Sequence, residues 1–543
     1  MSGTSDISLP VLPKKKRAKV RWFVLILVQI LILLHIALWL LGNHFGWFGG
    51  KTITPIEPSE GMELVKNGVI NAGAIFFALA LLSTCIFGRW FCGWGCHIVF
   101  LQDWCYALLR KLGIRPKPFR ARLLGWVPLG LGLYMFVWPL FYRIVLAPWL
   151  QPHLRWPAIT TDLTTEHFWE TFVSPLMAIP FLFVCGFATV YTLGAKGFCT
   201  YGCPYGGFFA PLDRLAPVRI RVTENCQQCG KCTAACTSNV RVHEEVHLHK
   251  MVVDSGCMKT MDCIDACPND ALSVGFIGAS IGTKSARKTG KYDLTISGEL
   301  GIFSIFLIGF FSFRGLYASV PMLMAVGMSL VSTWIIWKGV LLLQEKNVSL
   351  HRHQLKFHGT FRPAGKLVLV FSLFTVLFVI QSGAVGLFVV AGNAAAKNGN
   401  LNSARSYYKL SGPMTDGGIG FASNPNVDLA LSKILEANGD LQEAERLLRR
   451  LNSTVENDQT ATMVLGQNLQ LHHEPATVEQ FYIETLDANP NWTLIWEDYV
   501  AWLRREGRHS DAVQASTKAN SLNQNAARLQ MQWQLLQQQN HLQ

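Results

Sequence analysis

Seven apolar stretches in the first 391 residues predict a helical membrane protein. An α-helix needs about 20 apolar residues to cross a bilayer, and each stretch approaches or exceeds that length. The region between Leu300 and Leu343 is long enough for two spans, because Arg314 and Pro321 interrupt it and indicate a turn near Gly315 to Pro321. The predicted spans are Trp22 to Leu41, Val69 to Phe87, Leu123 to Leu146, Pro175 to Leu193, the two parts of Leu300 to Leu343, and Leu367 to Val390.

The polar segments between these stretches alternate in basic charge. Lys14 to Lys19 ahead of the first span is strongly basic, and the linkers after spans two, four and six are rich in Lys and Arg. Because such loops stay in the cytoplasm, the pattern predicts a cytoplasmic N-terminus and Cys-rich linker, and a C-terminal domain on the other side. We expect a multi-pass protein of the bacterial inner membrane, with this domain in the periplasm. The three basic linkers are Arg110 to Arg122, Lys196 to Lys291 and Lys346 to Lys366.

Beyond residue 391 the pattern becomes polar and amphipathic. A G-x4-A motif recurs, and Gly439 and Gly507 lie 68 residues apart, twice the 34-residue period of tetratricopeptide (TPR) helix pairs. Such repeats present a concave surface to a protein partner; an unrelated helical domain is the alternative. The predicted fold is mostly α: a polytopic helix bundle of about seven spans with an inserted two-cluster ferredoxin domain (α+β) and an all-α, TPR-like C-terminal domain. The predicted divisions are residues 1–20, 21–215, 216–291, 292–391 and 392–543.

Composition supports this organisation and narrows the chemistry. Half of the residues are hydrophobic and 15% are charged, which excludes a disordered chain and argues against an ordinary soluble enzyme. The net charge is +13, yet residues 392–543 carry 12 Lys and Arg against 16 Asp and Glu. The basic excess thus belongs to the membrane part and reflects topology, with no nucleic-acid partner expected. All 14 cysteines lie between Cys85 and Cys267, in short-spaced motifs typical of metal and redox sites.

The strongest motif is C-x2-C-x2-C-x3-C, formed by Cys226, Cys229, Cys232 and Cys236. This is the spacing of bacterial ferredoxins, in which three thiolates hold one cluster and the fourth ligates the other cluster. A second run carries Cys257, Cys263 and Cys267, followed by Pro268, with Thr260 where a further Cys is expected. Zinc is the alternative, because C-x2-C pairs also suit that ion.

Crossed ligation divides these cysteines into two sets. One [4Fe-4S] cluster takes Cys226, Cys229, Cys232 and Cys267. The other takes Cys236, Cys257 and Cys263, and the missing thiolate at Thr260 predicts either a [3Fe-4S] centre or a [4Fe-4S] cluster with one distinct iron. Water, Asp262 or another group is then the candidate fourth ligand.

A repeated C-x3-C motif follows spans two and four. Cys92 and Cys96 form the first copy, and Cys199 and Cys203 the second, each preceded by a basic residue, Arg89 or Lys196. The four thiols can converge on a third iron–sulfur cluster or a copper ion, since soft thiolates bind both. Alternatively each pair is a redox-active dithiol on one helical face, because residues i and i+4 are neighbours there.

In these motifs and their order the sequence resembles the membrane-bound polyferredoxins, which include the NapH-type, NosR-type and CcoG-type proteins. The resemblance covers about Val69 to Gly275. His97 replaces the proline that usually follows the first C-x3-C pair, and Thr260 replaces a cysteine. The C-terminal helical repeats differ from the immunoglobulin-like outer domain of the CcoG type. The resemblance implies electron transfer at the membrane.

The leading hypothesis is an electron-transfer subunit of an oxidoreductase system, for which no catalytic residue is assigned. It passes single electrons between the quinone pool or a soluble cytoplasmic donor and a respiratory or metalloenzyme partner docked at the C-terminal repeats. One alternative is a CcoG-like copper reductase or assembly factor that uses the C-x3-C thiolates. Another is an assembly scaffold whose clusters sense redox state.

Overall fold

The computed structural model describes residues 14–47, 51–151, 158–165, 168, 175–283, 292, 294–351, 353–454 and 458–522. It divides into two compact units, Met1–Arg314 with Val320–Val379 and Gly315–Ser319 with Ile380–Gln543. Residues 1–13 of the predicted N-terminal segment and residues 284–291 at the end of the predicted ferredoxin domain lie outside the described part.

Apolar helices dominate the first unit, which confirms the predicted mostly-α polytopic class. In the described part, five helices are long and apolar enough to cross a membrane. They coincide with predicted spans one, three, five, six and seven. At spans two and four the structure has the shorter apolar helices Ala72–Phe87 and Met177–Leu193, so the count of seven crossings stays a prediction. The five long helices are Arg17–Phe45, Leu124–Leu150, Ile296–Phe313, Met322–Gln344 and Pro363–Lys397.

Small residues bring the last three of these helices close together. Helices α17 (Ile296–Phe313) and α18 (Met322–Gln344) are joined by a turn at Gly315, whose φ of +66° suits glycine. The turn falls where the sequence predicts it. A β-carbon on Gly339 of α18 would lie 2.1 Å from Ser372 Oγ of α19 (Pro363–Lys397), so this glycine permits the close helix contact.

The helix of span three contains two π-helical segments, and each ends two residues before a proline. The segments are Leu133–Val137 and Tyr142–Leu146, and the prolines are Pro139 and Pro148. A proline ring lacks a backbone N–H and clashes with the carbonyl four residues earlier. Local widening to i→i+5 hydrogen bonds relieves that clash without ending the helix.

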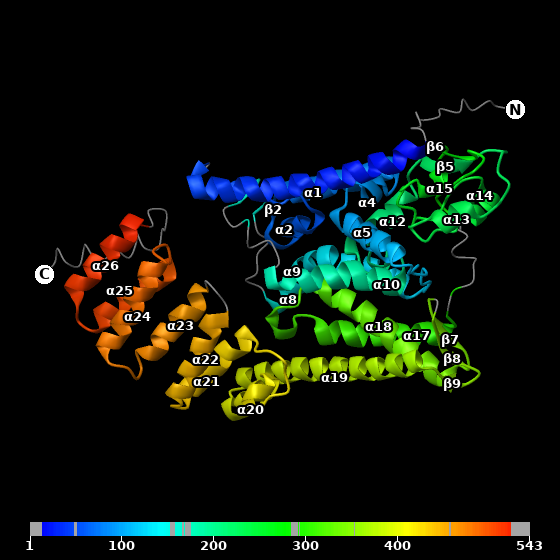
Figure 1. The fold of residues 1–543 in the computed structure, drawn as a ribbon. Coiled ribbons are helices and arrows are strands. Elements are labelled where there is room, and N and C mark those ends of the chain that lie inside the picture. The colour runs from blue at the N-terminus through cyan, green and yellow to red at the C-terminus, as the bar shows by residue number, and fades with distance from the viewer. Residues whose placement is uncertain are drawn as a thin grey trace. The chain divides into compact units, whose positions relative to one another are not determined.

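A compact α+β region is inserted between the fourth and fifth apolar helices (Figure 1). Strand β5 (Val218–Val222) pairs antiparallel with β6 (Leu272–Phe276), with Ile220 opposite Val274. Helices α13 (Lys231–Ala235), α14 (Val242–His249) and α15 (Asp262–Asp265) lie between the strands in sequence. Its core contains apolar side chains such as Ile220, Val246 and Ile264 together with Cys257 and Cys263. The predicted α+β ferredoxin element is therefore present.

Short helices and strands complete the first unit. Helix α1 (Lys14–Phe45) contacts α4, α5 and α15, and Figure 1 shows it running along these elements. The remaining bounds are β1 (Thr52–Ile53), α2 (Gly61–Asn67), β2 (Val69–Ile70), α3 (Ala72–Phe87), α4 (Trp90–Trp94), α5 (His97–Lys111), α6 (Val127–Gly132), α7 (Trp138–Phe141), α8 (Ala147–Leu150), β3 (Thr160–Thr161), β4 (Thr164–Thr165), α9 (Pro175–Leu182), α10 (Thr189–Leu193), α11 (Gly197–Tyr201), α12 (Pro204–Asp213), β7 (Val348–Leu350), β8 (His353–Phe357) and β9 (Thr360–Phe361).

Helices connected by short turns form most of the second unit. Consecutive helices pack on one another, and buried leucines, alanines and aromatic residues fill the space between them. All-α structure is thus confirmed for the described part, whereas the assignment to the TPR family remains a prediction. The helices are α20 (Leu401–Ser411), α21 (Pro425–Ala437), α22 (Leu441–Thr454), α23 (Gln459–Leu469), α24 (Pro475–Ala488), α25 (Thr493–Arg505) and α26 (His509–Leu522).

Candidate iron–sulfur site

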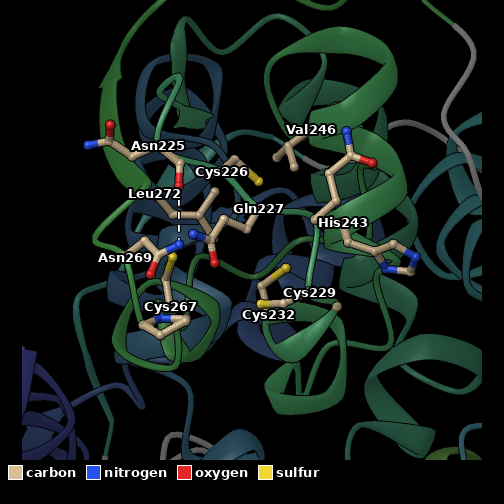
Figure 2. A pocket seen from close by; sticks show the side chains of 13 residues that line it. Asn225, Cys226, Gln227, Cys229, Cys232, His243, Val246, Cys267, Asn269 and Leu272 are labelled. Atoms are coloured by element: carbon tan, nitrogen blue, oxygen red, sulfur yellow. Dashed lines mark hydrogen bonds between the residues drawn. The ribbon is translucent and has the colours of Figure 1, made fainter.

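Four cysteines from the two ferredoxin motifs line one pocket. Figure 2 shows Cys226, Cys229 and Cys232 on one side of it and Cys267 on the other. The first three come from the loop before α13 and from α13 itself, where Gly230 adopts φ +72° and turns the chain. Cys267 is the last cysteine of the second motif and lies just after α15. Crossed ligation predicted this grouping, and the structure brings the four side chains together.

The surroundings of this pocket suit a metal–thiolate centre. The backbone N–H of Ala271 donates to Cys267 Sγ at 3.3 Å, a contact that stabilises a sulfur carrying negative charge. Asn269 Nδ2 donates to the carbonyl of Asn225 at 3.3 Å and ties the two loops across the pocket rim, as the dashed line in Figure 2 shows. The donor set of soft thiolates fits an iron–sulfur cluster.

Cys236, Cys257 and Cys263 form a second, more deeply buried set. They share a core with the strands β5 and β6. Burial, together with the neighbouring Cys257, raises the pKa of the Cys236 thiol to about 12. Burial and the two other thiols likewise raise the pKa of Cys263. These groups are therefore poor free thiolates, and a bound cation would have to displace their protons.

Thr260 lies in a tight loop beside this second set. The residues on either side, Lys259 and Met261, have φ values of +53° and +66°. The Thr260 side chain is buried, with 8% exposure. Asp262, one candidate fourth ligand, accepts a hydrogen bond from Thr237 Oγ1 at 2.8 Å through its Oδ2 atom.

The two C-x3-C motifs have the same local structure, and this structure corrects one prediction. Cys92 lies in α4, which ends at Trp94, and Cys96 is the residue that precedes α5. Cys199 and Cys203 repeat this arrangement at α11 and α12. Each pair therefore spans a break between two helices and does not occupy one helical face. The alternative prediction, a dithiol formed by two cysteines on one helical face, is therefore wrong.

All four C-x3-C thiols nevertheless converge. Cys199 interacts electrostatically with Cys92, Cys96 and Cys203. Burial and the neighbouring thiols raise the pKa of Cys96 to about 12, and that of Cys203 to about 11. Two chain segments about a hundred residues apart thus bring four buried thiols together, and the binding of a metal or cluster by them stays a prediction.

Met258 joins this four-thiol set to the second ferredoxin motif. Met258 forms one apolar cluster with Val99 and Cys199, and Cys92 and Cys96 pack against this cluster. A β-carbon on Gly93 would lie only 2.1 Å from the Met258 carbonyl oxygen, so the two backbones are in direct contact. Trp94 Nε1 also donates to the carbonyl of Lys259 at 2.9 Å. Because Met258 follows Cys257, the two thiol sets are neighbours.

The basic residues ahead of the two motifs occupy buried positions that the sequence did not reveal. Arg89 is 5% exposed, interacts electrostatically with Cys92 and Cys203, and donates to the Ser255 carbonyl at 3.2 Å. Lys196 is fully buried and lies beside Cys199. From the sequence, both residues indicate only the cytoplasmic ends of the preceding helices. The only sign of their role in the sequence is that a basic residue precedes each of the two C-x3-C motifs.

Two buried aspartates hold these cations in place. Asp103 of α5 pairs with Arg21 of α1 and with Lys196. Burial alone would raise the pKa of Asp103, but Lys196 and Arg21 lower it below its ordinary value. Asp213 Oδ1 accepts hydrogen bonds from the backbone N–H of Arg89 at 3.1 Å and from Lys259 Nζ at 3.2 Å.

Comparison with known proteins agrees with these sites. The 4Fe-4S dicluster domain matches residues 218–268, and a 4Fe-4S binding domain matches residues 71–115 and 175–223, one C-x3-C motif in each. In its first unit the chain is thus similar to 4Fe-4S proteins of the ferredoxin type. The resemblance to membrane polyferredoxins is thereby confirmed, and it concerns the first unit.

Three relatives illustrate the extent of the similarity. The methylamine utilization ferredoxin-type protein MauN of Methylorubrum extorquens is 24% identical over 263 residues, covering 45% of this chain and 82% of the relative. The ferredoxin-type protein NapH of Haemophilus influenzae is 24% identical, covering 43% and 79%. The putative electron transport protein YccM of Escherichia coli is 26% identical, covering 37% and 54%.

We predict that Asp103→Asn destabilises the protein by about 3–5 kcal/mol, because it leaves Arg21 and Lys196 as buried charges without a counter-ion. The measurement is the free energy of unfolding in mild detergent. Asp487→Asn is the matched control: Asp487 is exposed and lies 3.8 Å from Lys518, so its loss costs less than about 1 kcal/mol. Equal stabilities of the two variants would contradict the assignment.

Proposed function

We propose that the protein is a membrane-bound iron–sulfur electron carrier in which the ferredoxin motifs and the four C-x3-C thiols form one continuous redox path. The observation that supports this proposal most directly is that Met258, which follows Cys257, shares one apolar cluster with Cys92, Cys96 and Cys199. Relatives named as ferredoxin-type or electron transport proteins support it.

The proposed ligands follow the two groupings of ferredoxin cysteines. Cys226, Cys229, Cys232 and Cys267 hold a [4Fe-4S] cluster, and the clusters supply reversible one-electron storage. Cys236, Cys257 and Cys263 hold the second cluster, whose remaining corner faces Thr260. The four C-x3-C thiols hold a third centre beside it.

The protein's own residues tune these sites through charge and exclusion of water. Arg89 and Lys196 place two positive charges beside the C-x3-C thiols, which offsets the negative charge that four thiolates bring to a buried site. Val99, Met258 and Ile98 cover the set with apolar surface. Charge and solvent exposure are the factors that set the reduction potential of such centres.

We further propose that electrons enter from quinol or a soluble cytoplasmic donor and leave to a partner held by the second unit. The basic linkers support a cytoplasmic position for the cysteines. In the second unit, a pocket between α24, α25 and α26 is lined by Trp496 and Tyr499 and by the ion pair of Glu479 with Arg508. Aromatic and arginine side chains of this kind are common in protein interfaces.

Thr260→Cys tests whether the second cluster lacks a cysteine ligand at one position. We expect the parent protein, purified without oxygen, to contain iron and acid-labile sulfide and to show the EPR signal of an oxidised three-iron centre or one iron that a chelator removes. The added thiolate completes the ligand set, so the variant should lose that signal or retain that iron. Thr260→Ser is the matched control and should behave as the parent. Identical iron content and spectra in all three proteins would refute the missing ligand at position 260. Absence of iron and sulfide from the parent would refute the proposed function.

The position of Met258 in one cluster with Cys92, Cys96 and Cys199 also favours a second candidate, copper handling. Thioether and thiolate sulfurs are soft ligands that select Cu(I). In this reading the four thiols bind copper, and the ferredoxin motifs supply the electron that reduces Cu(II) to Cu(I).

Cys203→Ser separates the two candidates. If the set holds a third cluster, the variant should lose the iron and sulfide of one cluster per chain. If it holds copper, the variant should lose bound copper while its iron content stays unchanged. The measurement is metal and sulfide analysis of both proteins, with Cys85→Ser, a cysteine outside the three sets, as control. Equal iron, sulfide and copper in Cys203→Ser and the parent would exclude both candidates.

A further inference from the structure

Two histidines and a glutamate converge in the second unit, away from every cysteine motif. Glu445 lies on α22, and His472 and His473 lie in the turn that follows α23. His472 Nε2 is 3.0 Å and His473 Nε2 is 2.9 Å from the same atom, Glu445 Oε2. Among the described residues, this is the set of three metal-ligating side chains whose ligand atoms all lie within 4.8 Å of one another.

The backbone fixes the ring of His472 in a specific way. Its Nδ1 atom lies 3.0 Å from the Asn468 carbonyl oxygen. A carbonyl only accepts, so Nδ1 carries the proton and donates. In a neutral ring Nε2 then presents its lone pair to Glu445 Oε2, and two electron-rich atoms face one another. A proton on Nε2 or a cation between the atoms removes this repulsion.

Glu445 is oriented by a second contact. Arg449 Nε donates to Oε1 at 2.6 Å, which leaves Oε2 directed at the histidines. The side chains of Glu445 and His472 are each 16% exposed and that of His473 is 32% exposed, so the group is partly shielded yet open to a small ion. Hydrogen bonds to the outer atoms of ligands, as here from Arg449 and to Asn468, are typical of metal sites.

The three ligand atoms lie close enough together to bind a first-row divalent ion. Zinc binds imidazole nitrogen and carboxylate oxygen at about 2.0–2.2 Å in a tetrahedral shell, so neighbouring ligand atoms are about 3.3–3.6 Å apart. The Nε2 to Oε2 distances of 2.9 and 3.0 Å are slightly shorter than that separation, and a small outward movement of the side chains admits the ion. Two imidazoles with one carboxylate are the protein ligands of open zinc sites, in which water or a further ligand completes the shell.

We propose that Glu445, His472 and His473 form a binding site for a divalent transition-metal ion of the zinc class, independent of the iron–sulfur centres. The ion binds Nε2 of each histidine and Oε2 of the glutamate. It links α22 to the turn after α23 and leaves at least one coordination position for water or for a side chain of a partner.

Zinc binding to the full chain, with its iron–sulfur centres assembled, tests this site. Zn²⁺ alone is titrated in competition with a chromophoric chelator, using the parent, Glu445→Gln and His473→Gln. We expect the parent to bind one tight zinc equivalent more than either variant. His509→Gln is the matched control, because His509 is an exposed histidine on α26 of the same unit, and it should bind zinc as the parent does.

A second measurement follows stability in place of zinc stoichiometry. Zn²⁺ should raise the melting temperature of the helical second unit in the parent, because a ligand that binds only the folded state stabilises it. The same addition should leave Glu445→Gln unchanged. Equal zinc stoichiometry in the parent and both site variants, loss of zinc in His509→Gln as well, or a parent melting temperature that does not respond to Zn²⁺ would each overturn the proposal.

Discussion

Gly93 and Met258 approach so closely that no side chain fits between their backbones, and the arrangement of the redox sites depends on this contact. Gly93 lies inside the first C-x3-C motif, whereas Met258 lies inside the second ferredoxin motif. Their contact holds a loop of the α+β region directly against the ends of the membrane helices. Met258 of the second ferredoxin motif consequently shares one apolar cluster with Cys92, Cys96 and Cys199.

Buried positive charges stabilise the C-x3-C thiols when these lose their protons and become anionic. Arg89 and Lys196 are buried beside the C-x3-C thiols, and neither would remain there without a partner. Asp103 pairs with Lys196 and Arg21, and Asp213 accepts from the backbone of Arg89 and from Lys259. The same ion pairs that hold the cations therefore connect α1, α5 and the second ferredoxin motif.

Most residues of the candidate site could be predicted from motif spacing, because the spacing of ligands within one loop is a local property of the sequence. Crossed ligation predicted that Cys267 would join Cys226, Cys229 and Cys232, and the pocket contains all four. The membrane helices were predictable because their apolar length is fixed by the bilayer. Helix α3 (Ala72–Phe87) starts three residues later than predicted span two, because Val69 and Ile70 form strand β2 and Asn71 caps the helix.

Long-range contacts were beyond the reach of the sequence. No local pattern indicates that Met258 packs on Cys199 or that Asp103 pairs with Lys196, because both contacts join distant segments. The alternative that Cys92 and Cys96 lie on one helical face is wrong, because α4 ends at Trp94 and a new helix starts after Cys96. Glu445, His472 and His473 have no motif spacing at all, and only the packing of α22 against α23 brings them together.

The central claim is that the C-x3-C thiols hold a redox centre next to the cluster of Cys236, Cys257 and Cys263. Its most direct test is EPR spectroscopy of the stepwise-reduced protein, which detects magnetic interaction between neighbouring paramagnetic centres. The account predicts that the signal of that cluster is split or broadened in the parent and becomes sharp in Cys203→Ser. An identical, unperturbed signal in both proteins would contradict it.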